Sequence, residues 1–127
     1  MPSSIEDIIK SKAGDLGFFL TGICNPEILS DEGEKLKNWI SKGYHADMLW
    51  FERTLEKRID PSKVLQTVKS ILVFGLNYFK KTAASEKLGT GKISRYAIGK
   101  DYHEIISAKL SQLTDFLKTL KPDIKAL

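Results

Sequence analysis

The chain has 127 residues, of which 42% are hydrophobic and 28% are charged. This length suits one domain with a modest core, and the composition is ordinary for a soluble globular protein. No apolar run reaches the roughly 18 residues of a membrane-spanning helix, and the N-terminal residues do not have the pattern of a signal peptide. The single cysteine, Cys24, excludes an internal disulfide framework and predicts a reducing compartment, the cytoplasm.

The formal net charge of +4 is unevenly divided along the chain. Residues 1–60 carry 8 basic and 11 acidic side chains, whereas residues 61–127 carry 12 basic and 5 acidic ones. A basic segment, residues 80–100, could contact phosphate groups. Its cations are Lys80, Lys81, Lys87, Lys92, Arg95 and Lys100. The alternative is a solvated lysine-rich loop, which charge alone favours.

The N-terminal residues predict a helix followed by a strand. Ser3 and Glu6 have the spacing of a capping box, in which a serine caps the helix and a glutamate lies three residues on. Three isoleucines then share one helical face, and two glycines mark the end of the helix. The apolar run 18–23 is bounded by glycines, which is typical of a buried strand. We interpret Cys24, at the end of this strand, as a buried structural thiol.

The middle of the chain predicts further helices and a second strand. A capping pattern at 31–34, an apolar stripe and a glycine stop predict one helix, and residues 44–51 are predicted to form a short one. Asp60 followed by Pro61 is a strong helix start, because aspartate caps free backbone N–H groups and proline has its φ already fixed. The run 70–78 is rich in β-branched and aromatic residues and predicts the clearest strand.

The last predicted element is an amphipathic helix. It follows a polar loop at 79–92 and begins after Asp101, and its apolar residues recur at spacings of four, three, four and three until the chain nears Pro122. Two clear strands are too few for an independent sheet. The predicted fold class is therefore α+β: a small mixed sheet with helices packed on it, forming an incomplete domain of a larger protein.

Few residues outside the basic segment carry recognisable chemistry. One cysteine and two separated histidines do not have the ligand spacing of a zinc site, so we predict no metal ligands. His45 could donate a proton or contact a substrate, although a helix-capping role fits its local pattern better. Arg58 could direct its guanidinium at an anion or an amide, or could pair with Glu56 or Asp60, and spacing does not separate these interpretations.

The stretch ISRYAIGKDYH, residues 93–103, gathers polar and aromatic groups before the last helix. A loop that enters a helix N-terminus presents free backbone N–H groups and the positive end of the helix dipole. Gly99 allows close approach of the backbone to a ligand, Arg95 adds positive charge, and Tyr96 adds a flat amphipathic surface. The combination suits a large planar polar ligand with amide or phosphate groups, and it equally suits a helix cap with an aromatic staple.

A longer series of residues surrounds this stretch. Its members are Gly33, Trp39, Ile40, Gly43, His45 and Met48, then Arg58-Ile59-Asp60-Pro61, and then Asn77-Tyr78 at the end of an apolar strand. Together with the Arg-Tyr-Ala-x-Gly-x-Asp-Tyr-His element of residues 95–103, which is the specific part, the series resembles the N-terminal portion of epoxyqueuosine reductases. The similarity runs from about Gly17 to Leu120.

The resemblance implies a cytoplasmic enzyme that reduces epoxyqueuosine, at the wobble position of tRNA, to queuosine. It implies cobalamin and two 4Fe–4S clusters as cofactors, tRNA as the partner, and no membrane or DNA partner. Residues 1–127 would form the N-terminal part of the cobalamin-binding domain, and the iron–sulfur domain would lie outside them. The residues that would lie against the cobalamin are Arg58, Tyr96, Ala97, Ile98 and Gly99.

These 127 residues depart from the family in two ways. They lack the segment with the proton-donating aspartate and the cysteine runs that hold the clusters, so we predict no catalytic residue here and no reduction by this chain alone. The alternative is a small non-enzymatic binding module that contacts RNA through the basic 80–100 segment, with a steep salt dependence. A third possibility is a partner subunit whose exposed edge completes the sheet of another chain.

Overall fold

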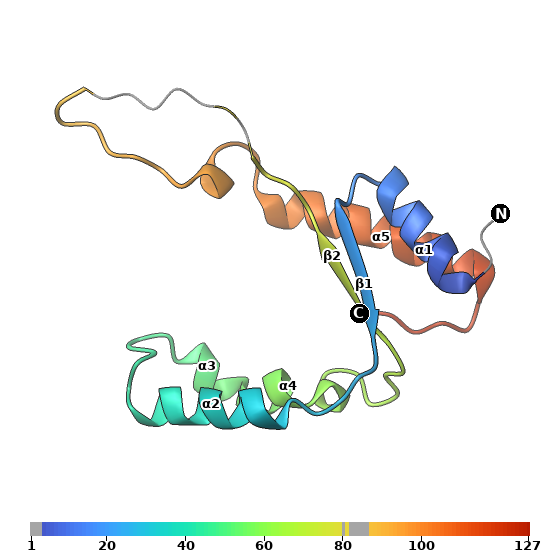
Figure 1. Ribbon diagram of the computed structural model, residues 1–127, viewed down its shortest axis with the longest axis horizontal. Helices are drawn as coiled ribbons and strands as arrows, with labels where there is room; N and C mark the ends of the chain where they lie inside the picture. Colours follow the sequence, from blue (N-terminus) through green and yellow to red (C-terminus); the bar gives the residue numbers. More distant parts are fainter. Residues whose placement is uncertain (1–3, 80, 82–86) are drawn as a thin grey trace. The chain divides into compact units, whose positions relative to one another are not determined.

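The computed structural model describes residues 4–79, 81 and 87–127 (Figure 1). Its elements in chain order are α1 (Ile5–Asp15), β1 (Leu20–Cys24), α2 (Ser30–Ser41), α3 (Trp50–Arg53), α4 (Leu55–Ile59), the 3₁₀ turn η1 (Pro61–Lys63), β2 (Ile71–Gly75), the 3₁₀ turn η2 (Arg95–Ala97) and α5 (Tyr102–Leu120). The chain divides into two compact units. The first unit comprises residues 1–22 and 73–126, and the second comprises residues 23–72 with Leu127.

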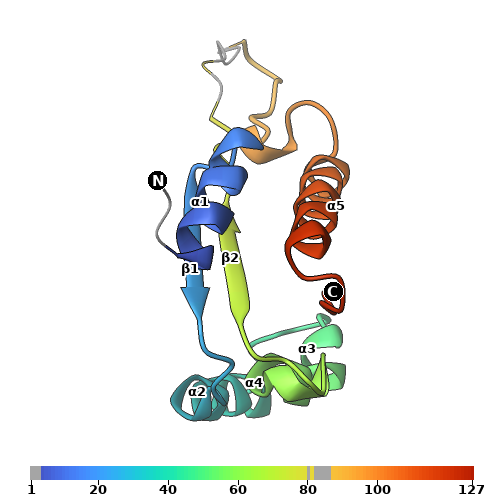
Figure 2. The same cartoon turned by 90° about the vertical axis from the view of Figure 1, so that its right-hand side faces the viewer.

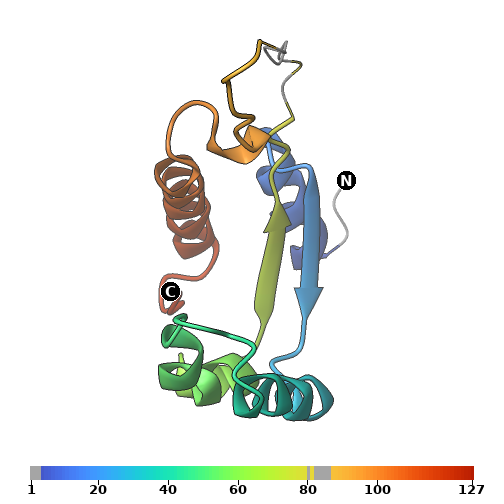
Figure 3. The ribbon, with the colours of Figure 1, turned by 90° about the vertical axis from the view of Figure 1, so that its left-hand side faces the viewer.

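The predicted α+β class is confirmed, and β1 and β2 form a two-stranded antiparallel sheet. Figures 2 and 3 show the two arrows pointing in opposite directions. The Phe19 N–H donates to the Gly75 carbonyl oxygen at 2.7 Å. A Cβ built on Gly22 would lie 4.0 Å from the Cβ of Val73, so these two residues are neighbours across the strands.

The sheet leaves alternate residues of β1 exposed. Leu20 is 62% exposed, and Cys24 at the end of the strand is exposed too. The predicted strand is therefore confirmed, but its predicted burial and the burial of the Cys24 thiol are wrong. Side chains of a strand alternate between two faces, and the described residues cover only one face of this sheet.

The core of the first unit lies where α1 and α5 pack together. Its buried hydrophobic residues are Ile9, Ala13, Phe18, Leu113 and Leu117. The Phe18 ring also lies 4.8 Å, between centroids, from the ring of Phe74 in β2. The predicted amphipathic helix is thus confirmed as α5, because the residues at its predicted spacing reach this core.

Side-chain and glycine caps set the ends of α1. Ser4 caps the helix by accepting the Asp7 N–H at 3.2 Å, one residue later than predicted, and Ser3 lies outside the described residues. At the other end, Gly17 adopts a φ of 86°. The Gly17 N–H donates to the Gly14 carbonyl and the Phe18 N–H to that of Ala13, which is a Schellman motif.

In the second unit, α2 packs against α4. The Leu29 N–H donates to the Ile59 carbonyl oxygen at 3.0 Å, and α2 begins at Ser30. The predicted cap at 31–34 is therefore wrong, because those residues already lie within the helix. Gly33 is buried and faces the Ile59 side chain, which occupies the space that a Cβ at Gly33 would need.

The short helix predicted at 44–51 is wrong. A turn follows Gly43, whose φ is 69°, and Ala46 also has a positive φ of 48°. Helical structure resumes only at Trp50. By contrast, the helix start at Asp60-Pro61 is confirmed, although it continues for a single 3₁₀ turn.

The predicted strand 70–78 and the predicted loop 79–92 follow η1 in the chain. The predicted strand 70–78 is confirmed as β2 but ends at Gly75. Of the predicted loop 79–92, residues 80 and 82–86 lie outside the described residues. Within the part that the structure describes, no helix is long and apolar enough to cross a membrane.

Candidate functional site

The Arg58 side chain is held in place at the end of α4. Its guanidinium carbon lies 4.4 Å from the centroid of the Phe51 ring, which is cation–π geometry. Its Nε donates to Thr54 Oγ1 at 2.9 Å, and Thr54 Oγ1 in turn donates to the Trp50 carbonyl oxygen at 2.5 Å. One face and one N–H of the guanidinium are thus occupied, while its two Nη groups have no hydrogen-bond partner among the described residues.

The structure does not pair Arg58 with either neighbouring carboxylate. Asp60 instead caps η1, where its Oδ1 accepts the Ser62 N–H at 2.9 Å. Hydrogen bonds from the side chain and then the backbone of Ser62 lower the pKa of Asp60. The interpretation of Arg58 as the partner of a neighbouring carboxylate is therefore wrong, and its interpretation as a contact to an anion or an amide stays a prediction.

Phe51, on which Arg58 stacks, belongs to an aromatic cluster. Trp39 from α2 lies 5.1 Å from Phe51 between ring centroids, at an interplanar angle of 75°. Trp50 lies 6.0 Å from Phe51 in a stacked arrangement. His45 completes the cluster through Trp39, because the centroids of these two rings lie 5.8 Å apart. These contacts tie α2 and the turn after it to the start of α3.

His45 is the buried polar residue of the second unit, at 6% exposure. Its Nε2 lies 2.6 Å from Glu52 Oε1, and its Nδ1 is buried without a hydrogen-bond partner in the part of the chain that the structure describes. The predicted helix-capping role is wrong, because α3 begins five residues later, at Trp50. The sequence signal that was missed is the glutamate at position 52, which reaches back to the imidazole.

The other predicted site residues surround η2 in the first unit. Tyr96 is 53% exposed and Ile98 is 40% exposed. Ala97 closes the turn by donating its N–H to the Ser94 carbonyl oxygen at 3.0 Å. Gly99 has a φ of 117°, which side-chain-bearing residues rarely adopt. The segment therefore presents two exposed side chains beside a small residue and a glycine.

A series of aromatic contacts connects η2 to the segment after β2 and to the start of α5. The Tyr96 ring lies 6.5 Å from that of Tyr78 and 6.0 Å from that of Tyr102, both in edge-on arrangements. Tyr102 stacks on His103 at 4.1 Å. Arg95 lies 4.7 Å from the centroid of the Phe79 ring. The predicted aromatic staple is therefore present, and Tyr96 is part of it.

Asp101 caps α5, as predicted. Its Oδ1 accepts the His103 N–H at 2.9 Å and lies 2.8 Å from His103 Nδ1. The backbone hydrogen bond from His103, followed by the side-chain one, lowers the pKa of Asp101. This pair fixes the helix start that follows Gly99.

The predicted cofactor contacts fall in both units. Arg58 belongs to the second unit, and Tyr96, Ala97, Ile98 and Gly99 belong to the first. The four residues of the first unit lie in and directly after η2. Arg58 lies on the ring of Phe51, in the aromatic cluster of the second unit. Among the described residues, no group of three or more histidine, cysteine, aspartate or glutamate side chains could hold a metal ion.

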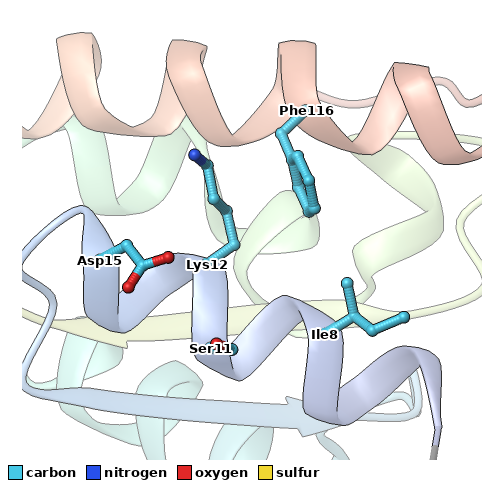
Figure 4. Close-up of a pocket in the computed structure, with 5 residues that line it drawn as sticks. All are labelled: Ile8, Ser11, Lys12, Asp15 and Phe116. Atoms are coloured by element: carbon cyan, nitrogen blue, oxygen red, sulfur yellow. The ribbon is translucent and has the colours of Figure 1, made fainter. Parts of the chain in front are cut away.

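A shallow groove between α1 and α5 does not involve the predicted residues. Its lining consists of Ile8, Ser11, Lys12, Asp15 and Phe116. Figure 4 shows Lys12 and Phe116 extending toward each other from the two helices, and the Lys12 ammonium lies 5.3 Å from the Phe116 ring centroid. This contact fastens the two helices to each other.

The basic segment is only partly described. Lys81, Lys87, Lys92 and Lys100 are exposed, whereas Lys80 lies outside the described residues. Arg95 is engaged with Phe79. Arg95 thus combines an aromatic contact with an exposed side chain.

Comparisons with known proteins agree with one another. A protein-family model described as epoxyqueuosine reductase QueG, DUF1730, matches residues 58–127. An epoxyqueuosine reductase of Cyclobacterium marinum is 38% identical over 125 residues, covering 96% of this chain and 39% of that protein. One of Atelocyanobacterium thalassa is 39% identical over 116 residues, covering 90% of this chain and 37% of that protein. The chain thus spans about two fifths of the length of these relatives.

Two solved structures share the fold. The epoxyqueuosine reductase of Streptococcus thermophilus aligns with a TM-score of 0.76 at 23% identity, over 94% of this chain and 32% of that one. A selenomethionine-labelled epoxyqueuosine reductase aligns with a TM-score of 0.79 at 27% identity, over 95% and 33%. The chain therefore corresponds to part of a larger fold.

Proposed function

Because the chain belongs to the epoxyqueuosine reductase family, we propose that it forms the N-terminal part of the cobalamin-binding domain of an enzyme that reduces epoxyqueuosine to queuosine in tRNA. The observation that carries this proposal is the family match over residues 58–127, which begins at Arg58 and includes Tyr96, Ala97, Ile98 and Gly99. The enzyme would act in the cytoplasm on the wobble position of tRNA.

The residues of this chain fit a large flat cofactor with amide side chains. Arg58 offers Nη donors from a guanidinium that is already stacked and anchored, and guanidinium N–H groups bind carbonyl oxygens well. Around η2, Tyr96 and Ile98 are exposed, and Ala97 and Gly99 add no bulk. These five residues would hold the cobalamin, which when bound would supply a strongly reducing centre for opening the epoxide.

This chain would bind and orient, and other parts of the enzyme would supply protons and electrons. Epoxide opening by reduction needs a proton donor and low-potential electrons. We propose that the aspartate that donates the proton and the cysteines that hold two 4Fe–4S clusters belong to the region of the family that this chain does not span. The chain alone would then bind without catalysing the reduction.

The alternative of an independent RNA-binding module is not favoured. Relatives named as epoxyqueuosine reductases cover nearly the whole chain, including the basic segment. A contribution of that segment to tRNA binding would be part of the same enzyme's function.

The experiment is nucleoside analysis of tRNA that carries epoxyqueuosine. The polypeptide that joins this chain to the rest of the family's length, with reconstituted clusters, cobalamin and a reductant, should convert epoxyqueuosine to queuosine. The matched controls omit cobalamin or use the 127-residue chain alone, and neither should give queuosine. Lack of conversion by the complete, loaded polypeptide would overturn the proposal.

A further inference from the structure

We infer that His45 is a positioning residue for Arg58, and that it acts through Glu52 and the ring of Phe51. This inference rests on the proposed function, since it concerns how the cobalamin-binding guanidinium of Arg58 is oriented. It begins from an unusual feature of the second unit: an imidazole that is 6% exposed and has one ring nitrogen without a partner among the described residues.

The imidazole of His45 is held by its hydrogen bond to Glu52. A carboxylate oxygen can only accept, so His45 Nε2 carries the hydrogen in its 2.6 Å contact with Glu52 Oε1. In the neutral ring, Nδ1 is then an unpaired acceptor. Burying a polar atom without a partner is unfavourable, so packing alone does not explain a histidine here. The bond to Glu52 is the contact that a leucine of similar size could not make.

Glu52 and Trp39 connect this hydrogen bond to Phe51. Glu52 follows Phe51 directly in α3, which is only four residues long. Trp39 contacts both His45 and Phe51, because the centroid of its ring lies 5.8 Å from that of His45 and 5.1 Å from that of Phe51. The imidazole therefore holds α3 through Glu52 and supports the Trp39 ring against which Phe51 packs.

Phe51 and Thr54 in turn fix the side chain of Arg58. The guanidinium lies over the Phe51 ring at 4.4 Å, and its Nε is anchored on Thr54. An arginine side chain that is fixed before binding loses less conformational freedom when the ligand arrives, which raises affinity. If α3 rotates or frays, the ring beneath the guanidinium moves and that advantage is lost.

The test measures cobalamin affinity by absorbance titration of the complete polypeptide. His45→Leu should weaken binding about three- to tenfold when Arg58 is present and should have no further effect when Arg58 is replaced by alanine. His45→Gln retains an N–H donor for Glu52 and should restore most of the affinity. Equal weakening in both backgrounds, or failure of glutamine to restore affinity, would overturn the inference.

A second pair of variants covers the case in which His45→Leu does not fold. Glu52→Gln alters the half-exposed partner of the imidazole and should also weaken binding, by about two- to fivefold. The matched control is Glu34→Gln, which breaks an exposed pair with Lys37 on α2 and should leave affinity unchanged. Equal behaviour of the two variants would contradict the role of the His45–Glu52 pair.

A readout without cobalamin separates this inference from the proposed function. The side-chain Nε–H resonance of Arg58, identified by its loss in Arg58→Lys, should shift in His45→Leu and stay in place in His45→Gln. An unchanged resonance in His45→Leu would overturn the positioning role. Unchanged cobalamin affinity in Arg58→Ala would instead overturn the proposed contact between Arg58 and the cofactor.

Discussion

The guanidinium carbon of Arg58 lies 4.4 Å from the centroid of the ring of Phe51, which precedes it by seven residues in the sequence. A cation over an aromatic face is stabilised by about 0.5–1 kcal/mol when the site is exposed. The contact also fixes which edge of the guanidinium faces outward, so its loss should affect ligand binding as well as packing.

Replacing Phe51 by leucine should therefore weaken cobalamin binding by the complete polypeptide about two- to fivefold. The leucine keeps an apolar side chain in the cluster but removes the ring face beneath Arg58. The matched control is Trp50→Leu, since Trp50 stacks on Phe51 and has no cation–π contact with Arg58. Absorbance titration measures both variants, and equal weakening would contradict the specific role of Phe51.

Replacing Gly33 by alanine should destabilise the second unit by about 1–2 kcal/mol. The new Cβ would lie 3.0 Å from two carbon atoms of the Ile59 side chain, and the backbone of Ile59 is held by the Leu29 N–H. The matched control is Gly14→Ala in α1, where a Cβ meets nothing within 4 Å. That control should leave the protein as stable or up to about 1 kcal/mol more stable. Urea unfolding measures both, and a neutral Gly33→Ala would contradict the close packing of α2 and α4.

Replacing Asp101 by asparagine should reduce the acid sensitivity of α5. The folded-state pKa of Asp101 is lowered by the hydrogen bonds from His103, so the ionised carboxylate stabilises the folded state. That contribution is present above about pH 4, the ordinary pKa of aspartate, and is lost as the pH falls through the lowered pKa. Asparagine caps helices about as well as aspartate, so stability at neutral pH should change little.

The measurement is the free energy of unfolding at pH 7 and at pH 3 for the wild type and for Asp101→Asn. The difference between the two pH values should be smaller in the variant. Asp115→Asn, an exposed change within α5, is the control. An unchanged difference in Asp101→Asn would contradict the lowered pKa of Asp101.

Features that depend on nearby residues could be predicted from the sequence. The start of α5 follows from Asp101, and its buried face follows from the spacing of leucines such as Leu113 and Leu117. The turn at Asp60-Pro61 was also predictable, because a capping aspartate and a fixed φ act locally. The exposure of Cys24 was not predictable in this way, because it depends on which face of the sheet other parts of the chain cover.

In the candidate site too, local features could be predicted from the sequence, whereas contacts between residues distant in the sequence could not. Gly99 has a positive φ and the side chains of Tyr96 and Ile98 are exposed, while the interpretation of ISRYAIGKDYH as a loop that can approach a flat ligand stays a prediction. Sequence spacing could not separate the two interpretations of Arg58, because the answer lies in contacts with Phe51 and Thr54. The burial of His45 was missed for a similar reason: it depends on Trp39 and Glu52, which no local pattern connects to it.

The most direct measurement is an absorbance titration of cobalamin into the complete polypeptide and its Arg58→Ala variant. The proposal predicts saturable binding by the wild type and an affinity about tenfold or more lower in the variant, because hydrogen bonds from a charged group contribute about 1.5–3 kcal/mol. Arg53→Ala, which removes another exposed arginine of the second unit, should bind like the wild type. Equal affinities for all three proteins, or no binding by the wild type, would contradict the proposed place of this chain in a cobalamin-binding domain.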